Sequence, residues 1–458
     1  MKLVLPHCVR ALLILWLLPL VLCAAEKTAL DRYVAKPDPA FAWRHVDTSA
    51  AEGAKVHLLE MTSQRFLTAA EVDRPEWRHW MRVIVPREVK SSTALLAIGG
   101  GSNKADPPRD TQPFGLRVAN TAHTVVVELG QVPNQPLTFA GDTRTRSEDA
   151  IIAYTWNHFL KTGDDRWPLR LPMTKAAVRA MDAATAFLAS REGGGLRVDK
   201  FVVTGASKRG WTTWSTAIVD PRVVAIAPVV FDALNMEPSF RHHRSAYGHY
   251  AEAVHDYVDL RIMDSMGTPE FAALRRIEDP YEYRKRLTLP KFILNAAGDQ
   301  FFLPDSWQFY WDALPGPKHL RYVPNAGHDL RDTDAAESLL AFHHAVVHAR
   351  ALPRYEWHVD PAGVITARTQ DAPSSVRLWQ VTNPTARDFR NDKLAARWTS
   401  QPLRPDANGT YTATVPKPPK GWTAALVEMT FPGEVVPFKF TSGVLVTPAT
   451  LPHPFPKK

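Results

Sequence analysis

Between Arg78 and Ala349 the chain alternates short runs of apolar residues with longer stretches at helical spacing. A strand of an antiparallel sheet with one wet face would alternate apolar and polar residues, whereas these runs are almost continuously apolar. Such strands, separated by helices, predict a parallel sheet covered by helices on both faces. The expected strands are residues 80–86, 94–98, 124–129, 201–204, 223–227 and 291–295.

Three further regions can be distinguished: a segment before the α/β pattern, an insertion within it and a domain after it. Residues 26–75 read as a polar lead-in, and the α/β domain is expected over residues 76–352. Within it, residues 238–289 are rich in His, Tyr, Arg and Asp and predict a helical insertion that covers the site as a cap. Residues 353–450 carry β-branched, alternating segments separated by Gly, Pro, Asn and Asp, which predict an all-β sandwich domain.

The N-terminus has the pattern of a secretory signal peptide over residues 1–25. Lys2 and Arg10 are followed by an apolar stretch, residues 11–22, that is too short to span a bilayer comfortably. Small residues then precede Glu26, as at a cleavage site. The alternatives are a retained membrane anchor and a lipoprotein signal. The favoured interpretation is a secreted or periplasmic protein without an integral membrane anchor after cleavage.

Both cysteines, Cys8 and Cys23, lie inside this predicted signal. A lipoprotein signal at Cys23 is disfavoured because the bulky Leu22 stands where a small residue belongs. The mature chain would therefore contain no cysteine. Disulfides, thiol catalysis and cysteine-ligated zinc are excluded for it.

Charge and histidine spacing argue against nucleic-acid and metal partners. The 55 Lys and Arg residues are interspersed with 47 Asp and Glu residues, and no basic run marks a nucleic-acid arm. His344 and His348 are four residues apart on an expected helix, but the Glu of a zinc-protease helix is missing between them. We therefore expect no metal and no cofactor.

The segment 203–210 contains the strongest catalytic signal. A short strand runs into Gly205-Ala206-Ser207 and then into an expected helix, which is the context of a nucleophile elbow. The usual Gly-x-Ser-x-Gly form is not met, because Arg209 stands two places after the serine and Gly210 three. The alternative is a surface turn in which Ser207 caps the helix.

A serine nucleophile needs a base and an acid that orients it, in the chain order Ser, acid, His for this architecture. Asp299 follows the expected strand 291–295, and His328 follows a further strand at 320–323. Both therefore lie just beyond the carboxyl ends of strands, where sites form in open α/β sheets. Asp299 is the favoured acid, and Asp305 and Asp232 remain alternatives.

Stabilisation of an oxyanion requires backbone donors near the serine. The N–H of Lys208 follows directly from the elbow. Gly99, Gly100 and Gly101 come after the strand at 94–98 and are expected to bring a second N–H to the substrate. The alternative is a flexible glycine loop without a role.

Eight stretches together are similar to the PhoPQ-activated pathogenicity-related protein family. They are residues 132–137, 146–156, 167–173, 205–212, 279–281, 299–306, 324–328 and 386–390. The resemblance implies an α/β-hydrolase-like core and, in some members, a link to virulence or to defence against host peptides. Where the family commonly has Asp-Glu-Phe-Phe, this chain has Asp299-Gln300-Phe301-Phe302, which keeps the candidate acid.

These observations predict an α/β protein with an α/β-hydrolase core, a helical cap and a C-terminal β-sandwich. The expected function is that of an exported, metal-independent serine hydrolase, an esterase or peptidase. Its substrate would be a small molecule, a carbohydrate ester or a peptide. The alternative is a secreted binding or signalling protein that keeps this fold without turnover.

Overall fold

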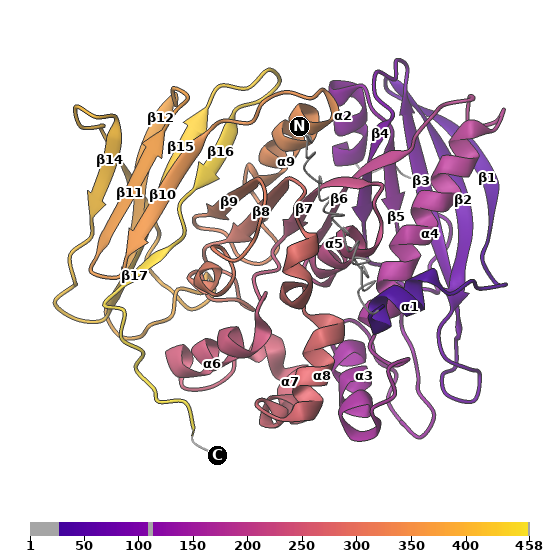
Figure 1. The fold of residues 1–458 in the computed structure, drawn as a ribbon, viewed down its shortest axis with the longest axis horizontal. Coiled ribbons are helices and arrows are strands. Elements are labelled where there is room, and N and C mark those ends of the chain that lie inside the picture. Colours follow the sequence, from indigo (N-terminus) through magenta and orange to yellow (C-terminus); the bar gives the residue numbers. More distant parts are fainter. Residues whose placement is uncertain (1–26, 109–112, 457–458) are drawn as a thin grey trace, which may run out of the picture.

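The centre of the molecule is a nine-stranded sheet with the order β1-β2-β3-β5-β4-β6-β7-β8-β9 (Figure 1). The computed structural model describes residues 27–108 and 113–456, so the predicted signal peptide lies outside the described residues. The strands are β1 (Ala42–Ala51), β2 (Ala54–Arg65), β3 (Glu76–Pro86), β4 (Thr93–Ile98), β5 (Val126–Leu129), β6 (Lys200–Ala206), β7 (Val223–Val229), β8 (Lys291–Ala296) and β9 (Lys318–Val323).

Two pairing modes meet inside this sheet. The strands from β5 to β9 pair in parallel, as the apolar runs predicted. The strands β1, β2 and β3 pair antiparallel, and β3 is antiparallel to β5. The prediction of parallel pairing is therefore wrong for the expected strand at residues 80–86, which lies in β3. Residues 42–65, described as a lead-in from the sequence, thus form two strands of the same sheet. The mostly exposed side chains of β1 leave little apolar signal there. The domain boundaries themselves stay a prediction.

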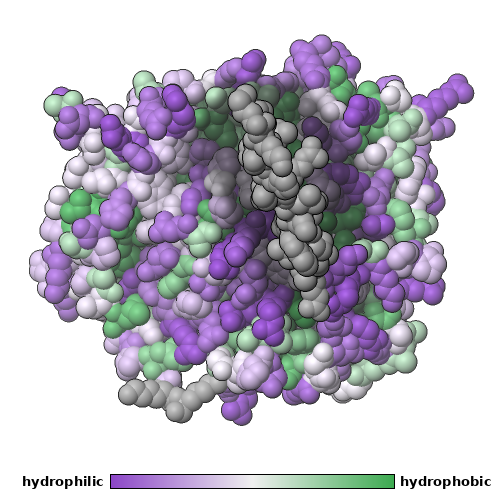
Figure 2. Space-filling model, viewed as in Figure 1, coloured by the Kyte–Doolittle hydropathy of each residue, from purple (hydrophilic) through white to green (hydrophobic). Residues whose placement is uncertain are grey.

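Helices cover both faces of the sheet, as expected. The helices α2 and α9 contact each other on one face, and α1, α4 and α5 pack together on the other. Hydrophilic and hydrophobic residues are interspersed over the face of the molecule seen in Figure 2. None of the helices within the described residues is both long and apolar enough to cross a bilayer. The bounds are α1 (Ala29–Ala35), α2 (Pro113–Ala122), α3 (Asp149–Thr162), α4 (Arg170–Ala189), α5 (Lys208–Val219) and α9 (Ala335–Val347).

The cap lies between β7 and β8 in the sequence, where the helical insertion was predicted. It is joined by α3, which contacts α7, α8 and η2 although it precedes them by about a hundred residues. The carboxylate of Asp279 accepts hydrogen bonds from the backbone N–H groups of Asn235 and Met236, and so fixes the start of α6. The cap elements are α6 (Met236–Tyr247), η1 (Glu252–Val254), α7 (His255–Asp259), η2 (Ile262–Ser265), α8 (Pro269–Glu278) and η3 (Pro280–Arg286).

The C-terminal region forms two antiparallel sheets, as predicted. Strands β10, β11 and β14 make one sheet, and β13, β12, β15, β16 and β17 make the other. Buried Ile365 and Ala413 of the first sheet belong to the same apolar cluster as Leu378 and Val427 of the second. The strands are β10 (Tyr355–Asp360), β11 (Val364–Thr369), β12 (Ser375–Asn383), β13 (Thr399–Pro402), β14 (Thr410–Thr414), β15 (Trp422–Phe431), β16 (Phe438–Thr441) and β17 (Leu445–Thr447).

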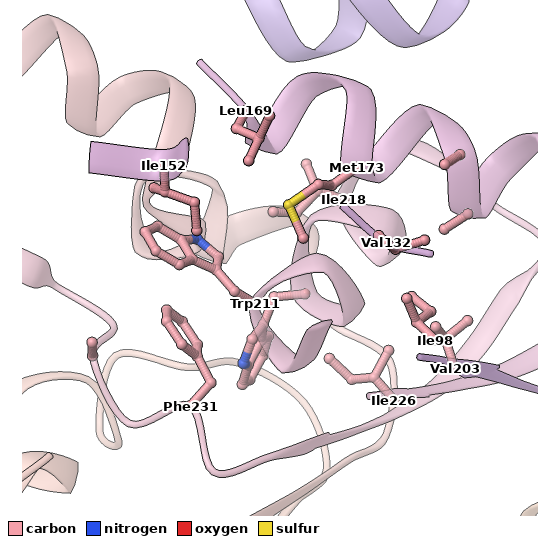
Figure 3. Packing of buried hydrophobic residues seen from close by; sticks show 14 of the residues in the cluster. Ile98, Val132, Ile152, Leu169, Met173, Val203, Trp211, Ile218, Ile226 and Phe231 are labelled. Carbon is pink, nitrogen blue, oxygen red and sulfur yellow. The ribbon is translucent and has the colours of Figure 1, made fainter. Parts of the chain in front are cut away.

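A large apolar core supports the N-terminal end of α5. Figure 3 shows Trp211 and Phe231 beside each other below Ile152, and their rings stack with centroids 4.7 Å apart. Val203 of β6 and Ile226 of β7 lie beneath the same helix and are fully buried. The N-terminal part of α5 is therefore held in place by packing on several sides.

Candidate active site

Ser207 occupies a sharp turn between β6 and α5. Its φ of 58° and ψ of −127° form a conformation that an L-residue adopts only at an energetic cost. The turn is stabilised by the Ser207 N–H, which donates to the Val229 carbonyl at 2.8 Å. A strained serine at the carboxyl end of a parallel strand is the arrangement expected of a nucleophile elbow.

Two glycines make this turn possible. A Cβ on Gly205 would lie 2.8 Å from the backbone of Arg209, and one on Gly210 would lie 2.7 Å from the Val229 carbonyl oxygen. Both contacts are too close for a side chain. Gly210, three places after Ser207, is therefore a residue that lets α5 approach β7. This explains how the chain forms an elbow without a Gly-x-Ser-x-Gly pattern.

The structure brings Asp299 and His328 together. Nδ1 of His328 lies 2.8 Å from Oδ2 and 3.0 Å from Oδ1 of Asp299. Because a carboxylate accepts, the neutral form of the imidazole carries its proton on Nδ1 in this contact and presents Nε2 as an acceptor. Nε2 of His328 is buried and has no hydrogen-bond partner within the described residues. Such an imidazole is ready to accept a proton.

The backbone around Asp299 orients its carboxylate. Oδ1 of Asp299 accepts from the N–H groups of Phe301 at 2.7 Å and Phe302 at 3.3 Å. The side chain of Gln300 accepts from the N–H of His328 at 2.8 Å and so connects the acid turn to the histidine loop. The acid–base pair is thereby held by main-chain groups as well as by its own hydrogen bond.

The two alternative acids have other partners. Asp305 pairs with Arg387 at 2.5 Å and with Nε2 of His242 at 3.0 Å. Burial alone would raise the pKa of Asp305, but these two groups hold it well below its usual range. Asp232 accepts the hydroxyl groups of two buried tyrosines, Tyr310 and Tyr322, and burial raises its pKa to about 7. His328 is paired with neither.

A small apolar cavity lies beside Ser207, and two of its walls are phenylalanines that flank His328. It has a volume of about 40 Å³ and is lined by Ser207 together with Phe301 and Phe302. The rings of these two phenylalanines also lie beside the His328 ring, with centroids 4.3 and 6.0 Å away. The remaining lining residues are Asp149, Trp156, Lys208, Trp211, Phe231, Ala233, Met236, Phe240, Val254 and Tyr257.

The two cations after the nucleophile are paired internally. Nζ of the buried Lys208 lies 2.7 Å from Glu148 and 2.9 Å from Asp149, and Arg209 makes a two-pronged contact with Glu148. Burial opposes ionisation of Glu148, but Arg209 and Lys208 lower its pKa to about 2. Their side chains anchor the first turn of α5.

Glu148 is a site residue that sequence reasoning missed. Its backbone has φ 53° and ψ −127°, close to the conformation of Ser207, and the side chain of Gln135 accepts from its N–H at 2.7 Å. Glu148 lies about sixty residues before Arg209, so no local pattern joins them. Its position just before an apolar helix resembles an ordinary helix start.

The glycine loop requires one correction. The N–H of Gly99 donates to the Leu129 carbonyl at 2.7 Å, so it is not available to an oxyanion. A Cβ on Gly100 would collide with the guanidinium of Arg209. None of the three glycines is among the described residues that line the cavity. The loop packs against Arg209, and a donor role for Gly100 or Gly101 stays a prediction.

Among the described residues no group of three or more His, Cys, Asp or Glu side chains could hold a metal ion. The rings of His344 and His348 lie 4.6 Å apart, and Nε2 of His348 is engaged with the Ala122 carbonyl. Metal independence of the reaction stays a prediction.

The fold and the order of its elements define an α/β-hydrolase core with a helical cap and a C-terminal β-sandwich. The chain belongs to the PhoPQ-activated pathogenicity-related protein family, whose model matches residues 30–390. It is 37% identical over 472 residues to the autocrine proliferation repressor protein A of Dictyostelium discoideum, covering 96% of this chain and 94% of the relative.

Solved structures with a similar core are more distant. Acetyl xylan esterase 1 of Thermoanaerobacterium has 17% identity and a TM-score of 0.46, over 68% of this chain and 90% of that one. An acylaminoacyl peptidase of Pyrococcus horikoshii has 13% identity and a TM-score of 0.40, over 69% of this chain and 51% of that one.

Proposed function

We propose that this protein is an exported serine hydrolase that cleaves an ester or amide through Ser207, His328 and Asp299. The observation that carries the proposal is the combination of a strained serine on an elbow with a hydrogen-bonded Asp–His pair whose carboxylate is buried. The cavity at Ser207 shares two aromatic walls with His328. Export rests on the signal peptide predicted for residues 1–25.

The reaction would follow from these positions. Oγ of Ser207 attacks the substrate carbonyl carbon while Nε2 of His328 takes its proton. Asp299 stabilises the imidazolium that forms. Collapse of the tetrahedral intermediate breaks the bond to the leaving group, which receives that proton. Water, activated by the same Nε2, then releases the acyl group from Ser207 and restores the enzyme.

The oxyanion of the intermediate would be stabilised at the start of α5. The N–H of Lys208 follows the nucleophile directly, and the positive end of the helix dipole lies at the same place. The side chain of Lys208 is already paired with Glu148 and Asp149. Its backbone, rather than its charge, is therefore the group proposed to act on the oxyanion.

The walls of the cavity favour a small apolar acyl group. Aromatic side chains from α3, α5, the cap and the acid turn enclose it, and its volume is about 40 Å³. An acetyl group suits this space better than a long fatty acyl chain. Small-molecule esters, carbohydrate esters and peptide amides with a small acyl part are the substrate classes that we propose.

Labelling with a fluorophosphonate, which reacts with an activated serine, tests the proposal. Wild-type protein should be labelled and should hydrolyse p-nitrophenyl acetate faster than p-nitrophenyl octanoate. Ser207→Ala should lose both reactions. Absence of labelling in correctly folded wild-type protein would contradict the proposal.

A second candidate function belongs to a different class. The relative from Dictyostelium, similar over almost its whole length, is named as an autocrine proliferation repressor, which describes a signalling role. A secreted signalling or binding protein could keep the same fold without turnover. The two candidates are separated by asking whether Ser207→Ala retains the biological effect of the protein while losing hydrolysis.

A further inference from the structure

A segment of the sandwich domain reaches the candidate active site. We call residues 384–398 the strap, because this stretch leaves the sandwich after β12 and returns to it at β13. It contains the stretch 386–390 that supported the family resemblance but has no part in the proposed triad. In Figure 1 the sandwich strands and α6 of the cap lie toward the same edge of the central sheet, the edge formed by β9.

The strap holds the turn that carries the acid. The N–H of Asn391 donates to the carbonyl of Gly298 at 2.8 Å. A Cβ on Gly298 would lie only 2.9 Å from Cβ of Asn391, so the two backbones are in close contact. Gly298 directly precedes Asp299. The position of the acid is thus fixed from the sandwich side.

The strap also holds the loop that carries the histidine. Oδ1 of Asn325 accepts from the N–H of Trp398 at 2.8 Å, and Nδ2 of Asn325 donates to the Trp398 carbonyl at 3.0 Å. Asn325 has a φ of 59° and lies three residues before His328. This reciprocal pair fixes the turn from which the base is presented.

The third anchor connects the strap to the cap. Arg387, with only 3% of its surface exposed, pairs with Asp305, which in turn contacts Nε2 of His242 on α6. The guanidinium of Arg390 lies over the ring of Tyr247 on the same helix, 4.4 Å from its centroid. Because α6 contributes walls to the cavity, this anchor acts on the cap that covers Ser207.

From these three anchors we infer that the strap is the element that positions the Asp299–His328 pair and holds α6 over the cavity, with Arg387 as its principal positioning residue. Removal of Arg387 would leave the buried carboxylate of Asp305 with His242 alone. A buried charge that loses its partner drives local rearrangement, and the acid turn and α6 are the elements nearest to it. Arg387 contacts none of the reacting groups. The inference rests on the proposed function. Hydrogen exchange, unlike labelling, can be measured whether or not the protein is a hydrolase.

The experiment compares two variants that break contacts of the strap, one on the strap and one on the histidine loop, with a control. Arg387→Met removes the charge at similar length. Asn325→Gly removes the pair with Trp398 and keeps a residue that tolerates positive φ. The control is Lys393→Met, because Lys393 lies in the strap but is exposed and pairs with Asp392, which is itself exposed. The measurements are the rate of fluorophosphonate labelling, the melting temperature, and hydrogen exchange at residues 298–305 and 324–328.

Both Arg387→Met and Asn325→Gly should be labelled at least about tenfold more slowly, since a misplacement of about 1 Å can lower a rate by about 10²-fold. They should also exchange faster at one or both loops, whereas the control should match wild type. If both variants are labelled at the wild-type rate and their loops exchange hydrogen at the wild-type rate, the inference is overturned. If Arg387→Met does not fold, Asn325→Gly decides alone. If wild-type protein is not labelled at all, the proposed function fails, and hydrogen exchange still decides whether the strap orders these loops.

Discussion

Substitution of Asp299 by Asn has a result that can be derived from the hydrogen bonds at the site. Oδ1 accepts the N–H groups of Phe301 and Phe302, while Oδ2 is the closer oxygen to Nδ1 of His328. In Asp299→Asn the amide oxygen has to keep the two backbone N–H groups. The amide NH₂ must then face His328.

The Asp299→Asn substitution thereby reverses the tautomer of His328. An NH₂ group can only donate, so Nδ1 of His328 becomes the acceptor and its proton moves to Nε2. Nε2 can no longer take the proton of Ser207. For a triad that loses its orienting acid in this way, the expected loss of kcat is about 10⁴-fold, which corresponds to about 5.5 kcal/mol in activation free energy.

The assay is hydrolysis of p-nitrophenyl acetate together with the rate of fluorophosphonate labelling, both corrected for the folded fraction. Asp305→Asn is the comparison, because Asp305 does not contact His328. It should lower the melting temperature and reduce the rates much less. If both variants reduce the two rates only mildly and to the same extent, Asp232 becomes the favoured triad acid. Near wild-type turnover in folded Asp299→Asn would refute the derivation.

Three further results are expected. Ser207→Ala and Ser207→Gly should both abolish labelling, and the glycine variant should melt at the higher temperature because glycine tolerates positive φ; the opposite order would argue against strain at the elbow. The pKa of Glu148 is lowered to about 2, so its stabilisation is present above about pH 4.5 and is lost as pH falls toward 2. The melting difference between wild type and Glu148→Gln should therefore shrink from pH 7 to pH 3, and a constant difference would contradict this. Finally, intact mass should place the mature N-terminus near Glu26, and reducing agent should leave the melting temperature unchanged; a chain retaining Cys23 with lipid would overturn the predicted signal.

The parallel part of the fold could be predicted from sequence because burial on both faces leaves an unmistakable pattern. The strands around Val203 and Ile293 are almost entirely apolar, so the chain order of strands and helices followed, and with it the positions of Ser207, Asp299 and His328 at strand ends. The antiparallel edge was less visible. Most side chains of β1 are exposed, and the strand resembles a polar segment.

Side-chain partners at the site depended on contacts between distant segments. Sequence spacing alone offered three acids for His328, and only the packed turns show that Asp305 is engaged with Arg387. Glu148 was missed for the same reason, since its partner Arg209 lies on another helix. The bond from Gly99 to the neighbouring strand, which removes it as an oxyanion donor, likewise has no signature in the local sequence.

The outer edge of β9 shows what the sandwich domain does for the central sheet. An exposed edge strand offers unpaired N–H groups to other chains and promotes aggregation. Here the N–H of Tyr322 donates to the hydroxyl of Thr441 on β16, and the hydroxyl of Tyr355 on β10 lies 3.3 Å from Nδ1 of His319 on β9. The opposite edge, β1, is protected by an irregularity between His45 and Asp47. The sandwich thus supplies side chains where a tenth strand would otherwise add, so a core without it would expose a template for intermolecular pairing.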